Sequence, residues 1–145
     1  MFADLLRRLS APAPARLPDA DARLALGALL VRLARADNDY SAVEIARIDA
    51  ILAERYGLAD PTELRSQCEA LEGEAPDTVR FTRAIKDAVA YEDRYAVIVA
   101  MWEIVLADGV RNAEENSLMR MVAPMLGVED QDSNAARIKV EARLK

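Results

Sequence analysis

The sequence predicts an all-α protein, a single-domain bundle of about seven or eight helices. Ala, Leu, Arg and Glu dominate the composition, and all four are strong helix formers. No segment alternates apolar and polar residues for long enough to indicate a strand. The chain of 145 residues contains only 5 Gly and 6 Pro, and most of them separate segments of helical periodicity. This length suits one domain.

The first segment is expected to be a short helix on a linker. Its apolar residues follow the spacing of one helix face: Phe2, Leu5, Leu6 and Leu9. Ser10–Pro18 contains three prolines among alanines, which is typical of a semi-rigid extended linker. We therefore divide the chain into residues 1–18, a short N-terminal helix and Pro/Ala linker, and residues 19–145, the helical domain. The apolar face of the short helix docks either on its own domain or on another protein or a membrane surface.

Capping and breaking residues delimit the helices of the domain. The expected helices span about 19–36, 42–56, 61–72, 77–90, 92–107 and 113–127, with a last helix from about 133 onward. The residues expected to cap them are Asp19 or Asp21, Ser41, Asp60, Asp77, and Asp132 or Ser133. Gly57 suits the left-handed position after a helix, and Pro61 suits the first position of the next. Gly73–Pro76 is expected to break the chain between two helices.

Two segments, Leu24–Ala36 and Tyr95–Ala107, are apolar nearly all round. A helix without a polar face is usually buried, so we place both at the centre of the bundle. We expect Trp102 and the nearby methionines to fill the core, with methionine adapting to gaps. Cys68 is expected to be a small buried residue, since no cation lies beside it in the sequence to activate the thiol.

An internal repeat begins at the ends of these two apolar segments. Its pattern is A-D-[NG]-x-x-[SN]-x-x-E. The two copies are Ala36-Asp37-Asn38, Ser41 and Glu44, and Ala107-Asp108-Gly109, Asn112 and Glu115. Each half is therefore a buried helix, a tight acidic loop and a second helix. Two copies predict a bundle with pseudo-two-fold symmetry rather than a solenoid.

The polar residues of the repeat allow a structural interpretation. Ser41 with Glu44, and Asn112 with Glu115, have the spacing of capping boxes. Capping leaves Asp37 and Asp108 unexplained, because each follows the C-terminal end of a helix, where the helix dipole disfavours a carboxylate. A neighbouring cation would offset this unfavourable interaction for both Asp37 and Asp108. The competing arginines are Arg35, Arg94 and Arg111.

A metal-binding interpretation supplies a different cation. In a helical hairpin each Asp can face the Glu across its loop, and the candidate metal ligands are then Asp37, Glu44, Asp108 and Glu115. The chain contains no histidine, and oxygen ligands favour Ca²⁺ or Mg²⁺ over zinc. The first loop is not an EF-hand, because Ala42 stands where glycine is required and Ile48 where the bidentate Glu belongs.

The two A-D-[NG] motifs resemble those of the TerB-like family, the tellurite-resistance protein B group. The resemblance covers about residues 24–128 and implies an all-helical domain, with the metal ligands assigned to the four motif carboxylates. It also implies a non-enzymatic module of tellurite-resistance and stress-response systems. Asn38 departs from the family pattern, which has glycine there. The alternative is a purely structural interaction domain whose acidic motifs are neutralised by arginine, without metal.

Composition narrows the function further. The formal net charge of −6 argues against nucleic-acid binding, which requires a basic surface. The absence of histidine excludes His-based catalysis, and no Gly-rich phosphate loop is present, so we expect no enzyme. No stretch is long and apolar enough to span a membrane. We expect a cytoplasmic protein with unidentified protein partners, and the Ala- and Arg-rich, Lys-poor composition favours a bacterial source.

Overall fold

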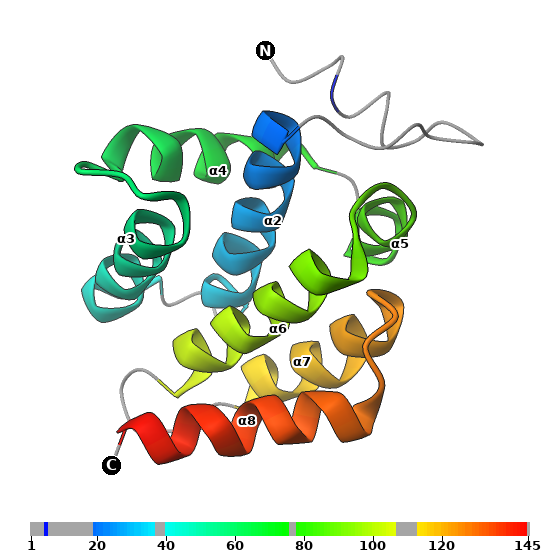
Figure 1. Cartoon of the computed structure of the whole chain (residues 1–145). Coiled ribbons are helices and arrows are strands. Elements are labelled where there is room, and N and C mark those ends of the chain that lie inside the picture. The colour runs from blue at the N-terminus through cyan, green and yellow to red at the C-terminus, as the bar shows by residue number, and fades with distance from the viewer. Residues whose placement is uncertain (1–4, 6–18, 37–39, 76–77, 107–112, 145) are drawn as a thin grey trace.

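The computed structural model describes residue 5 and residues 19–36, 40–75, 78–106 and 113–144. These residues form seven α-helices and no strand, which confirms the all-α fold class (Figure 1). The helices are α2 (Asp19–Ala34), α3 (Ala42–Tyr56), α4 (Thr62–Glu74), α5 (Thr78–Ala88), α6 (Tyr91–Val105), α7 (Ala113–Met125) and α8 (Asp130–Leu144).

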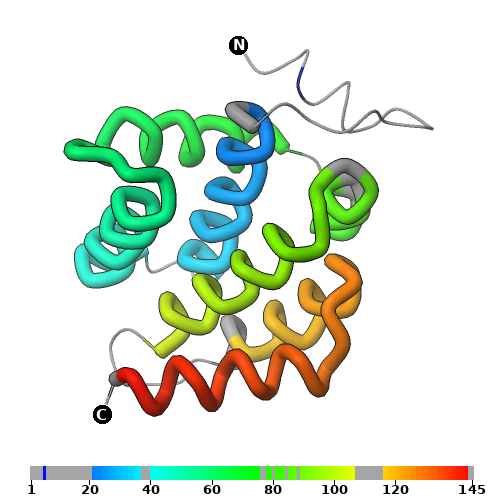
Figure 2. The backbone as a smooth tube through the Cα atoms, in the orientation of Figure 1, coloured from blue at the N-terminus to red at the C-terminus, as the bar shows by residue number. Residues whose placement is uncertain are grey.

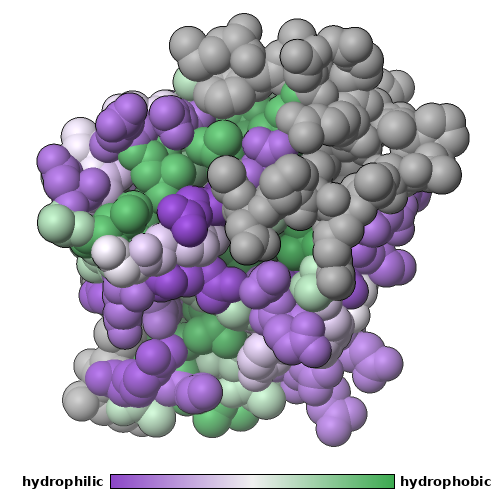
Figure 3. Space-filling model, turned by 45° about the horizontal axis from the view of Figure 1, so that its top comes forward, coloured by the Kyte–Doolittle hydropathy of each residue, from purple (hydrophilic) through white to green (hydrophobic). Residues whose placement is uncertain are grey.

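The two apolar helices α2 and α6 lie at the centre, as predicted. α2 contacts α3, α4, α5, α6 and α7, and α6 also contacts α3, α7 and α8. Leu29 and Leu33 of α2, and Ile98 and Met101 of α6, are fully buried. Leu5, from the segment before α2, is also buried in this core. Its burial is what docking of the N-terminal segment on its own domain would produce. On the face shown in Figure 3, hydrophilic residues surround smaller hydrophobic areas.

The two halves of the described fold make parallel sets of contacts. α2, α3 and α4 pack against one another, as do α6, α7 and α8. The contacts between the halves are paired too, since α3 contacts α6 and α2 contacts α7. Figure 2 shows α2–α4 and α6–α8 as two neighbouring groups, with α5 between them in the chain. A pseudo-two-fold repeat would produce this pairing, and the symmetry itself stays a prediction.

α2 and α4 approach closely at Gly27. A Cβ atom added to Gly27 would lie 2.4 Å from the Cys68 Sγ atom, so the contact requires a residue without a side chain. Cys68 is free and buried, and burial raises the pKa of its thiol to about 12, with the neighbouring Glu69 carboxylate acting in the same direction. This confirms the expected role of Cys68 as a small core residue.

Most predicted helix ends are confirmed. α3 ends at Gly57, whose φ of 64° is left-handed, and the Leu58 N–H donates to the Ala53 carbonyl oxygen. The Asp60 Oδ1 atom accepts from the Thr62 N–H at 3.0 Å, and this bond lowers the pKa of the Asp60 carboxyl.

Three predicted helix ends are wrong. α2 begins at Asp19, so Asp19 and Asp21 lie inside the helix and neither is its cap. Gly73 lies inside α4 instead of ending it. α8 begins at Asp130, so neither Asp132 nor Ser133 is its cap, and the Ser133 N–H already donates to the Glu129 carbonyl. The Ser133 hydroxyl has a different role: it accepts from the buried Trp102 Nε1–H at 3.1 Å. A buried indole N–H requires an acceptor, and this one comes from another helix.

Candidate functional site

Glu44 begins the candidate site at the N-terminal end of α3. It forms the predicted capping box: the Glu44 N–H donates to Ser41 Oγ at 3.1 Å, and the Ser41 N–H donates to Glu44 Oε1 at 3.1 Å. The Ser41 hydroxyl also lies 3.2 Å from Glu44 Oε1. Only 6% of Glu44 is exposed, so its carboxylate is nearly removed from solvent. All these bonds to the carboxylate reach Oε1, and none of them uses Oε2.

Two ion-paired side chains hold the end of α2, just before the first motif. Arg35 Nη1 lies 2.6 Å from Glu72 Oε1, and Arg32 Nε lies 3.2 Å from Glu72 Oε2. The Arg32 Nη2 group also donates to the Glu72 carbonyl oxygen at 3.1 Å. The Glu72 carboxylate of α4 is therefore shared by two guanidinium groups. This arrangement fastens the last turns of α2 to α4.

The residue before Ser41 is fastened to the same helix. The Tyr40 hydroxyl donates to Glu69 Oε2 at 2.6 Å, and the Arg35 guanidinium lies 5.0 Å from the centre of the Tyr40 ring. Burial and this bond raise the pKa of Tyr40 above its ordinary value. Arg65 lies between Glu69 and Asp49 of α3 and forms an ion pair with each. Both flanks of the first acidic loop are thus anchored to α4.

The other three predicted ligands fall outside what the structure describes. Asp37 and Asp108 lie outside the described residues, and Glu115 lies in α7 without a described side chain. The helix ends before and after residues 37–39 and 107–112 are described. The C-terminal end of α2 and the N-terminal end of α7 lie close together, and these two helices are in contact (Figures 1 and 2). We predict from this contact that the two motifs lie together at one end of the bundle.

Two of the arginines proposed to neutralise the motifs have partners elsewhere. Arg35 pairs with Glu72. Arg94 donates from Nε to the Val89 carbonyl oxygen at 2.9 Å and from Nη1 to the Leu126 carbonyl oxygen, so it joins the ends of α5 and α7. Arg111 lies outside the described residues. Within the part of the chain that the structure describes, no group of three or more Asp, Glu or Cys residues has the arrangement of a metal site.

The described surface also contains pockets, one of them lined by Asn116, the neighbour of Glu115 in the sequence. This pocket, of about 430 Å³, lies between α7 and α8 and reaches Trp102 and Ser133 at its floor, with Arg120 and Arg137 among its lining residues. A second, of about 520 Å³, is lined by residues of α3, α6 and α8.

A family model described as "Tellurite resistance protein TerB" matches residues 23–138, which is most of the chain. The chain belongs to the TerB family. The match contains both acidic motifs of this TerB domain and all seven described helices in whole or in part. Searches of curated proteins and of solved structures found no match.

Several structural contacts of this TerB domain were not predicted from the sequence. The Glu72 pairing with Arg32 and Arg35 joins residues 37 and 40 positions apart. A signal existed, since Arg32 and Arg35 stand three positions apart near the end of the apolar segment Leu24–Ala36. The capping role of Glu44 was predicted correctly.

Among the described helices of the domain, none has both the length and the apolar character needed to cross a membrane.

Proposed function

We propose that this TerB domain is a non-enzymatic, cytoplasmic module that binds a divalent cation and acts in a tellurite- or stress-response protein complex. The cation is Ca²⁺ or Mg²⁺, and its ligands are Asp37, Glu44, Asp108 and Glu115. The observation that supports the proposal is the buried carboxylate of Glu44 at the start of α3.

Glu44 fits the role of a hard-cation ligand. Its Oε1 atom is held by the Ser41 N–H and hydroxyl, so the carboxylate has a defined orientation. No described arginine or lysine forms an ion pair with Glu44. Burying a carboxylate without a cation is costly, and a divalent ion would offset that cost. An oxygen-only ligand set suits Ca²⁺ or Mg²⁺.

The surrounding residues would keep the site in place. Glu72 and Glu69 of α4 hold Arg35 and Tyr40 on either side of the first loop. Such outer contacts orient the ligands of metal sites and contribute to their affinity. When bound, the ion would supply charge neutralisation for carboxylates from both halves of the domain. In this function the protein binds the ion and orients its ligands, and no covalent bond is made or broken.

A second function class is a purely structural interaction domain without metal. The observation that favours it is the complete capping box, because Ser41 and Glu44 satisfy each other's backbone groups without an ion. The pairing of Glu72 with two arginines also shows how this chain neutralises an acidic side chain internally. In this alternative the motif carboxylates stabilise the ends of helices, and function lies in partner binding.

Thermal unfolding with Glu44→Gln separates the two classes. Glutamine preserves a capping box, since its side-chain oxygen still accepts from the Ser41 N–H, but it removes the charge that a metal requires. Millimolar Ca²⁺ or Mg²⁺ should raise the Tm of the unmodified chain, by the equivalent of about 2.7 kcal/mol at a hundredfold excess over Kd. The shift should be lost in Glu44→Gln and in Asp108→Asn.

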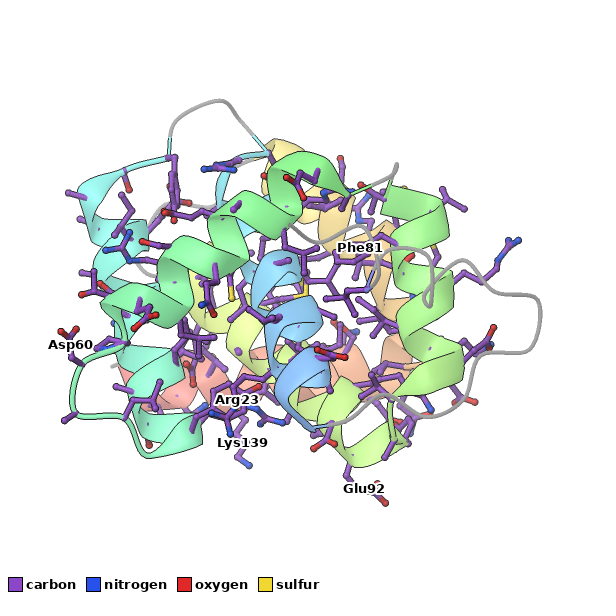
Figure 4. The ribbon with its side chains drawn as sticks, turned by 90° about the horizontal axis from the view of Figure 1, so that it is seen from above. Arg23, Asp60, Phe81, Glu92 and Lys139 are labelled. Carbon is purple, nitrogen blue, oxygen red and sulfur yellow. The ribbon has the colours of Figure 1, made fainter. Side chains whose placement is uncertain are left out.

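The matched control is Glu92→Gln, because Glu92 is exposed on α6 and points away from the bundle in Figure 4. This variant should keep the full metal-dependent shift. An unmodified chain whose Tm is unaffected by both ions would refute metal binding and favour the structural class. An equal loss in Glu92→Gln would show that the ions act through general charge screening.

A further inference from the structure

A groove of about 520 Å³ with an apolar floor lies on α6, with α3 and α8 on either side. The floor is formed by Ile51 of α3 and by Tyr95, Ala96, Val99 and Ala100 of α6. These four α6 residues have the spacing of one helix face. Figure 1 shows α6 between α3 and α8, and both of these helices contact it. Two helical walls over an apolar floor form the kind of groove that accepts a further helix.

The two walls of this groove carry charges of opposite sign. Glu54 of α3 lies on one wall and Lys139 of α8 on the other, and both are exposed. Figure 4 shows Lys139 extending outward from the bundle. The other charged lining residues, Arg55, Glu103 and Arg143, are in ion pairs within the chain. Among the described residues, Glu54 and Lys139 form no ion pair, so each wall offers one charge to a partner.

The outer face of α8 beside this groove carries an uncovered apolar side chain. Ile138 precedes Lys139 and is 59% exposed, more than any other large apolar side chain among the described residues. Ala135 and Ala142, which lie about one turn before and after it, are exposed as well. Their small side chains allow a partner helix to approach closely around Ile138. This face of α8 is therefore suited to packing against another helix.

We propose that two copies of this chain form a symmetric dimer, in which α8 of each copy packs antiparallel to α8 of the other and covers the other's groove. Under a two-fold axis, a surface that carries both a projecting residue and a groove is its own complement. Ile138 of one copy then enters the apolar groove of the second, and Lys139 faces the partner's Glu54. Because each copy supplies one charge of each sign, both charges find an opposite partner. These residues lie outside the acidic motifs, so the dimer does not depend on metal binding.

Sedimentation equilibrium of the full chain, with a chelator present, tests the proposal. Over about 1–300 μM the mass should rise from 16.0 kDa toward twice that value, with a micromolar Kd. Ile138→Asp places a charge in the apolar contact and should weaken dimerisation at least about tenfold. Position 138 is exposed, so the fold should be unaffected, and the urea midpoint checks this. The matched control is Val79→Asp at an exposed position of α5, which should leave the Kd within about twofold.

Charge reversal tests the pairing of Lys139 with the partner's Glu54. Glu54→Lys and Lys139→Glu each bring like charges together twice per dimer, and each should weaken dimerisation about three- to tenfold. The chain with both substitutions again has opposite charges at each contact, so its Kd should return to within about twofold of the unmodified value. Net charge alone would act in opposite directions in the two single variants, because one makes the chain less acidic and the other makes it more acidic.

Three results would overturn the proposal. The first is a mass of 16.0 kDa at every concentration, which would show that the groove does not bind a second copy and would leave it to a different protein. The second is a dimer that Ile138→Asp weakens no more than Val79→Asp does, which would place the interface elsewhere. The third is a doubly charge-reversed chain that dimerises no better than the single variants, which would exclude the pairing of Glu54 with Lys139 and the antiparallel arrangement with it.

Discussion

Gly27 is the position where a single methyl group should test how closely α2 and α4 pack. Alanine is favoured over glycine inside a helix by up to about 1 kcal/mol. At Gly27, however, the new Cβ would lie 2.4 Å from Cys68 Sγ. That sulfur is the first atom beyond Cβ of a fully buried side chain, so it has little room to move. Overpacking of this kind costs about 1–3 kcal/mol. We therefore expect Gly27→Ala to lower the free energy of unfolding by about 1–2 kcal/mol.

Removing the sulfur should reverse the effect. Cys68→Ala alone creates a small void and should cost about 1 kcal/mol. In the double variant, the methyl group of alanine at position 27 occupies the space that Sγ has left. The two substitutions should then be non-additive, with a coupling energy of about 1–3 kcal/mol in favour of the pair.

Urea unfolding of the four chains measures these differences through the midpoint and the m value. The matched control is Gly73→Ala in α4, where an added Cβ meets no atom within 4 Å. This variant should gain up to about 1 kcal/mol from helix propensity. A stabilised Gly27→Ala, with no coupling to Cys68→Ala, would refute the close approach of the two helices.

Three other outcomes can be measured in the same way. Trp102→Phe should lower the free energy of unfolding by about 1–3 kcal/mol because it leaves the buried Ser133 hydroxyl without its partner, and Ser133→Ala in that background should recover part of the loss. Burial raises the pKa of the Cys68 thiol from an ordinary 9.0 to about 12, so its contribution to stability is complete below pH 9.0 and should decline as the pH rises toward 12. In Cys68→Ala, the urea midpoint should fall less over this pH range, because the thiol is absent. Deleting residues 1–18 should cost about 1.5–3 kcal/mol through the loss of buried Leu5, and an unchanged urea midpoint would show that this segment does not stabilise the domain.

The candidate site was predictable to the extent that it depends on local contacts. The capping box of Ser41 and Glu44 was predicted because its partners stand three positions apart, and the spacing alone brings them together. The sequence could not show that Glu44 would be buried, because its burial depends on helices packed around the start of α3. The partners of Arg35 and Arg94 were equally unpredictable. Arg35 finds its acceptor on α4, and Arg94 finds one just after the end of α7, and their sequence neighbours gave no indication of either.

Local sequence patterns predicted the fold class, the central place of α2 and α6 and most helix ends. These features depend on helix propensity, apolar periodicity and caps, which act over a few neighbouring residues. Three contacts depend on how the helices pack: Gly27 faces Cys68, Glu72 pairs with Arg32 and Arg35, and Ser133 accepts from Trp102. The partners in these pairs stand about 30 to 40 positions apart. Which of many polar and small residues meet at such separations depends on how the helices pack, because packing brings together faces that are distant in the sequence.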